Sequence, residues 1–450
     1  MKRIDSRRHL SGRALLSAVL ALGAVLALLL GLVGCAAGST PPPPAGASTA
    51  AAPPHGGTAA APPHDSAASP QPVPATLQDG ALRLESLLGQ HAVLAADMMR
   101  GRIRNDEDFG QAASAAVTRN TDDLNQLVRE LSGAPAADQF RALWANHVIA
   151  LFTYSRGLAS DDAAARDHAR AELVRFENDI AAFFASAAQG RLSPETARSA
   201  VLTHVDHLLA QADAYAIGDY VRSNELYRQG YTHTFGLGHT LATTLLPADQ
   251  AAVLNEPQWR VRSELGRLLG EHVALAIAAL RAGAADSPDF TAAGAALDGN
   301  TNDLTGLVGS LFGEPTRTVF RTLWAEHTNQ LVAYTAAVAA HDPGRRDAAQ
   351  AALRGLEQRA AGFLGAAAAS NLGTPELVQA LVAHDDMLLR QVDAFVAKDY
   401  RQSNDLSYRA YQDMFGVSRQ LSDAFGATVA ARLPASGAQT GSGGTAPGPR

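Results

Sequence analysis

The segments Leu143–Leu151, LWANHVIAL, and Leu323–Leu331, LWAEHTNQL, each place a Trp and a His three residues apart within an apolar run. They begin 180 residues apart. The string NTDDLNQLV at Asn120 is matched at the same separation by NTNDLTGLV at Asn300, and HVDHLLAQADAYAIGDY is matched by HDDMLLRQVDAFVAKDY. Such long correspondences at one fixed separation indicate an internal duplication.

The duplication divides the chain into copy 1, residues 79–245, and copy 2, residues 257–430, with a linker at 246–256. Apolar residues within a copy recur at helical spacing, as at Leu84, Leu87 and Leu88, and no alternating strand pattern competes. Each copy is long enough for its own core. The sequence therefore predicts an all-α protein with two tandem homologous helical-bundle domains.

Breaks in the helical pattern near Asn105, Ser160 and Gly218 divide copy 1 into three helical hairpins, about six helices in all. Ser193 and Thr374 are each followed by a Pro and a Glu. A hydroxyl, a Pro and an early carboxylate are typical of a helix start, so both residues are predicted N-caps.

Three His residues of copy 1 lie on apolar stripes, one on the first helix of each predicted hairpin. Each precedes its hairpin turn by about 14 residues, or about 20 Å of helix, so they should share one level. The returning helices place Asn120 and His233 near the same level, and copy 2 has Asp413 where copy 1 has His233. The predicted polar layer comprises His91, His147, His204, His233 and Asn120 in copy 1, and His272, His327, His384, Asp413 and Asn300 in copy 2.

Two interpretations of this layer remain open. Three imidazoles with a fourth His or Asp ligand would suit copper or zinc, with Asn120, Asn300, Trp144 and Trp324 as supporting neighbours. Binding would then weaken as the pH falls through about 6.5, where free imidazole takes up a proton. Alternatively, the buried His and Asn side chains satisfy one another and set the register of Ala-rich helices.

The sequence contains no pattern that indicates a reaction. Walker, GxGxxG, GxSxG and HExxH motifs are absent, as are the Glu-x-x-His pairs of a ferritin-like di-iron site. We therefore expect a binding protein rather than an enzyme, and a catalyst that uses a bound metal with an open coordination position is the third alternative.

The N-terminus predicts export. Five basic residues precede an uncharged apolar stretch at 14–34, and LVGC closes it at Cys35. This ending resembles a bacterial lipobox, so residues 1–35 are predicted to be a lipoprotein signal with lipidation at Cys35. The 21-residue apolar run could alternatively remain as a membrane anchor. Both interpretations place the copies on the extracytoplasmic face of the cell membrane.

The mature chain is expected to be acidic and tethered. Removal of residues 1–34 takes away five basic residues and one acid, so the formal net charge changes from −7 to −11. This balance argues against nucleic acid and against docking on anionic lipid, which leaves the anchor as the membrane contact. Residues 36–78 are a Pro/Ala-rich segment predicted to be a disordered tether, and 431–450 a disordered tail.

The strings H-x-x-x-A, NT-x-DL, LW-x-x-H, H-x-x-x-LL and KDY resemble a helical domain of exported bacterial proteins that is sometimes found with copper amine oxidase-like modules. The resemblance covers both copies, residues 79–430, and implies copper among the metals. It does not imply oxidase activity, because that chemistry needs a modified Tyr in a β-rich catalytic domain. The sequence thus predicts a lipid-anchored binding protein that handles copper or another transition metal; a purely structural or protein-interaction module of the cell envelope is the alternative.

Overall fold

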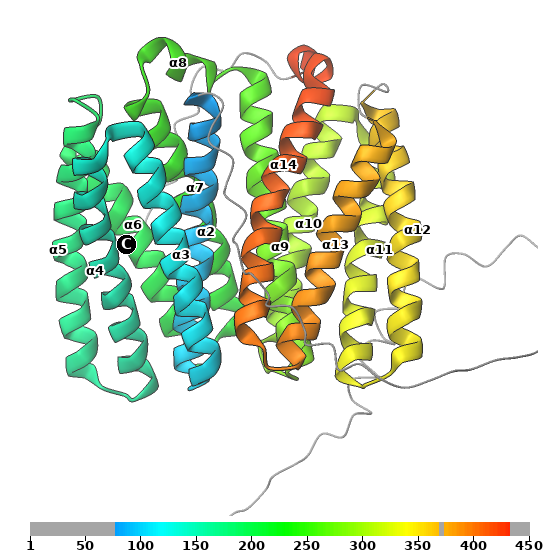
Figure 1. Ribbon diagram of the computed structural model, residues 1–450, viewed down its shortest axis with the longest axis horizontal. Coiled ribbons are helices and arrows are strands. Elements are labelled where there is room, and N and C mark those ends of the chain that lie inside the picture. Colours follow the sequence, from blue (N-terminus) through cyan, green and yellow to red (C-terminus); the bar gives the residue numbers. More distant parts are fainter. Residues whose placement is uncertain (1–76, 369–372, 433–450) are drawn as a thin grey trace, which may run out of the picture. The chain divides into compact units, whose positions relative to one another are not determined.

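The computed structural model describes residues 77–368 and 373–432, which form thirteen helices and no strands (Figure 1). The all-α prediction is confirmed. Copy 1 contains six helices: α2 (Leu77–Ile103), α3 (Glu107–Ser132), α4 (Ala134–Ala159), α5 (Ala163–Ala187), α6 (Pro194–Ala216) and α7 (Tyr220–Leu245). They form the three predicted hairpins.

A short helix, α8 (Ala248–Val253), lies within the linker between the copies. Copy 2 repeats the six-helix pattern with α9 (Pro257–Ala284), α10 (Phe290–Phe312), α11 (Glu314–Ala339), α12 (Pro343–Ala367), α13 (Thr374–Val396) and α14 (Tyr400–Arg432). Helix α2 begins at Leu77 and α14 ends at Arg432.

The hairpin turns of copy 1 occur where the sequence predicts them. Asn105, Asp161 and Gly218 adopt positive φ angles of 56°, 53° and 80°. The left-handed conformation ends a helix, and Gly, Asn and Asp adopt it at the lowest steric cost. Asp106 then starts α3 as its N-cap, because its side chain accepts a hydrogen bond from the Phe109 backbone N–H.

One of the two predicted N-caps is confirmed. The Ser193 hydroxyl accepts a hydrogen bond from the Thr196 backbone N–H at 3.1 Å, and Pro194 opens α6. The prediction for Thr374 is wrong, because Gly373 is the N-cap and Thr374 is already the first residue of α13. Gly373 offers no capping side chain, so α13 begins with Pro375 and with Glu376 in its first turn.

The signal, Cys35, most of the tether and residues 433–450 lie outside the described residues. Among the helices that are described, none combines the length and the apolar character needed to cross a bilayer.

The first helix of each copy occupies the centre of its bundle. Helix α2 packs against α3, α4, α6 and α7, and α9 packs against α10, α11, α13 and α14. Both helices are buried along most of their length (blue and light green in Figure 1). A side chain on α2 or α9 is therefore surrounded by protein and can meet side chains from several neighbouring helices.

The two copies are joined through buried and half-buried charged side chains. Arg228 on α7 donates to Glu271 on α9 at 2.8 Å and to Asp303 on α10 at 2.7 Å. Arg119 on α3 donates to Asp405 on α14 at 2.6 Å. Because Glu271 is buried, its pairing with Arg228 removes the large penalty of an isolated internal charge.

Candidate metal centres

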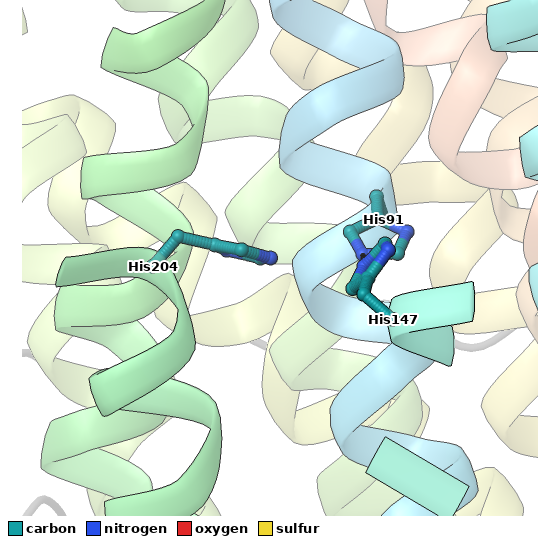
Figure 2. A group of neighbouring side chains, drawn as sticks. All are labelled: His91, His147 and His204. Carbon is teal, nitrogen blue, oxygen red and sulfur yellow. Dashed lines mark hydrogen bonds between the residues drawn. The ribbon is translucent and has the colours of Figure 1, made fainter. Parts of the chain in front are cut away.

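His91, His147 and His204 converge in the core of copy 1. They come from α2, α4 and α6, and one ring nitrogen from each lies within 4.8 Å of the other two. All three side chains are buried. Figure 2 shows the His204 ring extending from a separate helix toward the other two. These three histidines lie at similar distances along their helices from the hairpin turns, and their side chains meet in the core. We call His91, His147 and His204 the first centre.

A hydrogen bond sets the tautomer of His204. The Thr234 hydroxyl donates its proton to the Gly230 carbonyl oxygen at 2.7 Å, so its oxygen is left to accept from His204 Nδ1 at 2.8 Å. The proton of a neutral His204 ring therefore sits on Nδ1. Nε2 keeps its lone pair and has no hydrogen-bond partner within the described residues.

His91 and His147 share a contact of 3.0 Å between their Nε2 atoms. One of the two must donate a proton, because two lone pairs would repel at this distance. Asn120 donates to the Leu87 carbonyl oxygen at 3.0 Å, and its Oδ1 has no hydrogen bond in the described part of the chain. Asn120 lies beside His91, so this oxygen is available to accept a hydrogen bond from an Nδ1–H of His91. With the protons of both His91 and His147 on Nδ1, both Nε2 lone pairs would be free for a metal.

The imidazoles of the first centre are held neutral. Burial lowers the pKa of His91 well below its usual value, His147 lowers it further, and the neighbouring Asn120 raises it. Burial and the neighbouring His204 lower the pKa of His147. Burial lowers the pKa of His204, and His91, the next largest cause, lowers it further. Neutral imidazole is the form that binds metal ions.

His272, His327 and His384 form the second centre in copy 2. They come from α9, α11 and α13 and also offer ligand nitrogens within 4.8 Å of one another. Burial lowers the pKa of His327 to about 4 and that of His384 to about 3, and it lowers the pKa of His272 as well. Both ring nitrogens of His272 lack a hydrogen-bond partner among the described residues, as do His327 Nε2 and His384 Nδ1.

Each centre is bordered by a Trp and a Phe. Trp144 lies with its ring centroid 4.8 Å from that of His91 and 4.6 Å from that of His147, and Trp324 lies 4.7 Å from His272. Phe140 stacks on Trp144 at 5.1 Å, as Phe320 does on Trp324 at 5.2 Å. In both Leu143–Leu151 and Leu323–Leu331 the Trp precedes the His by three residues. This spacing places the two side chains on one face of the helix, so both lie at the same centre.

The fourth ligands expected from the sequence do not join the centres. His233 Nε2 contacts the Ala200 carbonyl oxygen at 2.8 Å, and Asp413 is exposed on α14. Neither belongs to a group of converging ligand atoms. Asn300 donates to the Leu268 carbonyl oxygen at 3.0 Å, as Asn120 does to Leu87, so both Asn residues tie the second helix of a copy to the first.

Sequence reasoning missed two acidic residues beside the second centre. Asp385 Oδ1 lies 3.5 Å from His327 Nδ1, and Glu357 lies next to Asp385. Burial raises the pKa of Glu357 to about 8 and that of Asp385 to about 7. The available signal was the pair HD at His384, where copy 1 has HV and therefore Val205.

The spacing of the ring nitrogens is close to that of a three-His metal site. Metal–nitrogen bonds of about 2.0 Å put three ligand nitrogens about 3.3 to 3.5 Å apart. The ligand nitrogens of each centre lie within 4.8 Å of one another, and the Nε2 atoms of His91 and His147 lie 3.0 Å apart. Small side-chain rotations would bring them to coordination distance. Comparisons with protein-family models, with curated proteins and with solved structures gave no match to this chain.

Proposed function

We propose that this chain is a lipid-anchored extracytoplasmic protein that binds copper through one three-His centre in each copy. The observation that carries the proposal is the convergence of three buried, neutral imidazoles, which occurs twice at matched positions. The anchor at Cys35 follows from the lipobox-like LVGC, and the chain offers no motif for a reaction. Binding rather than catalysis is therefore the proposed role.

Unpartnered nitrogens favour metal binding over a purely structural layer. A structural polar layer is expected to satisfy its hydrogen bonds, since each buried unsatisfied group costs about 1 to 3 kcal/mol. Here His204 Nε2 and several nitrogens of the second centre have no partner among the described residues. Each neutral imidazole carries one lone pair, and one ring nitrogen of each His in a centre lies within 4.8 Å of those of the other two, which is the arrangement a metal ion would use.

The charge around the first centre favours a monovalent ion. Its three ligands are neutral, and no carboxylate belongs to the group. The penalty for burying an ion rises steeply with its charge, so copper(I) should be preferred to zinc(II) there. In the second centre, an ionised Asp385 beside His327 could compensate a second charge. Copy 2 should therefore accept divalent ions more readily than copy 1.

Elemental analysis of the purified full chain after anaerobic loading with copper(I) tests the proposal. We expect two copper ions per chain, with one lost in His147→Ala and one lost in His327→Ala. His168→Ala, on the exposed face of α5, is the matched control and should retain both. A wild-type chain that remains free of metal under titration would show that the His groups are structural.

A further inference from the structure

The two centres differ in the space beside their histidines. In copy 2 a cavity of about 80 Å³ is bounded by side chains from all six helices, and both His327 and His384 line it. A cavity of about 30 Å³ in copy 1 is lined by apolar side chains such as Leu124 and Phe140, and by none of the three histidines. Of these two cavities, only the one in copy 2 therefore adjoins a His centre.

Three substitutions on one helix contribute to the difference. Phe176, Ile180 and Phe184 on α5 correspond, 180 residues later, to Leu356, Ala360 and Leu364 on α12. All three side chains of copy 1 are buried, and all three of copy 2 line the cavity. Each replacement removes side-chain volume from the core, which leaves a void when the backbone does not collapse to fill it.

Phe176 closes the first centre directly. Its ring stacks on His147 with centroids 4.3 Å apart and an interplanar angle of 17°. Leu356 has no ring to cover His327 in this way. In copy 1 an exogenous molecule therefore meets an aromatic side chain, whereas in copy 2 the imidazole faces the cavity.

The chemistry of the cavity selects a small uncharged ligand. Its lining is mainly Leu, Val and Phe, so its body is suited to apolar molecules. Polar groups occur at the end formed by the two histidines, Asp385 and Glu357. Trp324 also lines the cavity, and its indole Nε1 has no hydrogen-bond partner among the described residues. This N–H could donate to the far atom of a ligand held at the centre.

We propose that a metal ion in the second centre keeps one coordination position open to this cavity and there binds a small neutral molecule of a few atoms, whereas the first centre is closed. This inference rests on the proposed metal binding. Three protein ligands with a fourth position left free are the arrangement of metal sites that accept an exogenous ligand.

Carbon monoxide is the probe, because it is small, uncharged and a ligand of copper(I). The full chain loaded with two copper(I) ions should bind one carbon monoxide, measured by its infrared stretching band and by gas uptake. His147→Ala should lose one copper and keep the carbon monoxide. His327→Ala should lose one copper and the carbon monoxide together.

Variants that exchange the lining residues test the cavity separately from the ligands. The filled variant, Leu356→Phe with Ala360→Ile, gives copy 2 the residues of copy 1 at these two positions, and should retain two copper ions but lose carbon monoxide binding. Phe176→Leu with Ile180→Ala should open the first centre and add a second carbon monoxide. A thermal melt shows whether the filled variant folds. If it does not, carbon monoxide binding by the opened variant, Phe176→Leu with Ile180→Ala, still tests whether these side chains close a centre.

Xenon binding to the metal-free chain, measured by ¹²⁹Xe NMR, separates failure of the cavity from failure of the metal site. A chain that binds two copper ions but no carbon monoxide, or two equivalent carbon monoxide molecules, would contradict an open coordination position at the second centre alone. The proposed copper binding would remain supported. Absence of copper would overturn both, and xenon would still report whether the cavity admits a ligand. We expect the wild-type chain to bind xenon and the filled variant not to bind it. We also expect the copper-loaded wild type to bind one carbon monoxide for every two copper ions.

Discussion

The hydroxyl groups of Tyr231 and Tyr411, which are 180 residues apart in the sequence, lie 3.0 Å from each other in the core. Equivalent residues meet in this way only where a two-fold axis relates two surfaces, as in a symmetric dimer. Phe235 and Phe415, also equivalent, stack with centroids 6.2 Å apart. The two copies are therefore joined as a symmetric dimer would be, within one chain.

Glycines permit this close approach, which gives the first prediction. A Cβ at Gly270 would lie 2.7 Å from the Tyr231 hydroxyl and 2.9 Å from the Tyr411 ring. Gly270→Ala should therefore lower the free energy of unfolding by about 1 to 3 kcal/mol, measured by chemical denaturation. Gly236→Ala, where a Cβ meets nothing within 4 Å, is the control and should be neutral or stabilising. Equal effects of the two substitutions would contradict the tight Tyr contact.

Separate expression of the copies gives the second prediction. Residues 77–245 and 257–432 should each be helical by circular dichroism and should unfold cooperatively. Each half would expose the apolar face that carries Tyr231 and Phe235, or Tyr411 and Phe415, so we expect the halves to associate with one another when mixed. Sedimentation analysis measures that association. Two insoluble halves, beside a soluble joined chain, would mean that the bundles fold only together.

The third prediction concerns pH. Above about 6.5 the imidazoles are neutral in both the folded and the unfolded chain. As the pH falls, the unfolded chain takes up protons first, because His327 and His384 have folded pKa values of about 4 and 3. Their contribution to the free energy of unfolding should therefore decrease from about pH 6.5 down to about pH 4 in the metal-free protein.

The same pKa values change the expected pH for loss of metal. The sequence alone predicts release near pH 6.5, but ligands that stay neutral in the folded state should hold metal to about pH 4 to 5 while the fold persists. Dialysis at pH 5.5 followed by elemental analysis checks this. His384→Ala should also flatten the pH dependence of stability, whereas the exposed His168→Ala should not. Release of metal at pH 6.5 from a folded chain would contradict the lowered pKa values.

The fourth prediction concerns Asp385, which replaces the Val205 of copy 1. Burial raises the pKa of the Asp385 carboxyl in the folded chain to about 7. As the pH rises from about 4, the unfolded chain therefore loses the Asp385 proton before the folded chain does. Asp385 should thus reduce the stability of the metal-free protein increasingly up to about pH 7. Asp385→Val should stabilise the protein by about 1 to 3 kcal/mol at pH 8 and by less at pH 4. A gain that does not depend on pH would show that the carboxyl is not responsible.

The fifth prediction concerns the anchor. Cys35→Ser should abolish labelling of the chain with fatty acid and leave an unprocessed precursor, because the thiol is the group that would be acylated. Circular dichroism of the substituted chain should show its helices intact. Labelling and cleavage that continue at the same point would refute the lipobox interpretation.

Much of the fold could be predicted from local patterns. The apolar spacing predicts helices, and Asn105 and Gly218 mark hairpin turns because they adopt the left-handed conformation at low cost. The level of the three histidines could be predicted too, since distance along a helix from its turn is simple geometry. Thr374 could not be assigned correctly, because a hydroxyl before a Pro is compatible with both the cap and the first helical position.

The sequence by itself determined the helices, the duplication and the depth at which His91, His147 and His204 lie in the bundle. Tertiary structure alone decided that α2 is central, that His233 turns to the Ala200 carbonyl oxygen, and that Phe176 covers one centre while Leu356 leaves the other open. Periodicity along a chain specifies which face of each helix is buried. Which side chains then meet depends on how the helices rotate and pack against one another, and that is settled only when the whole core is filled.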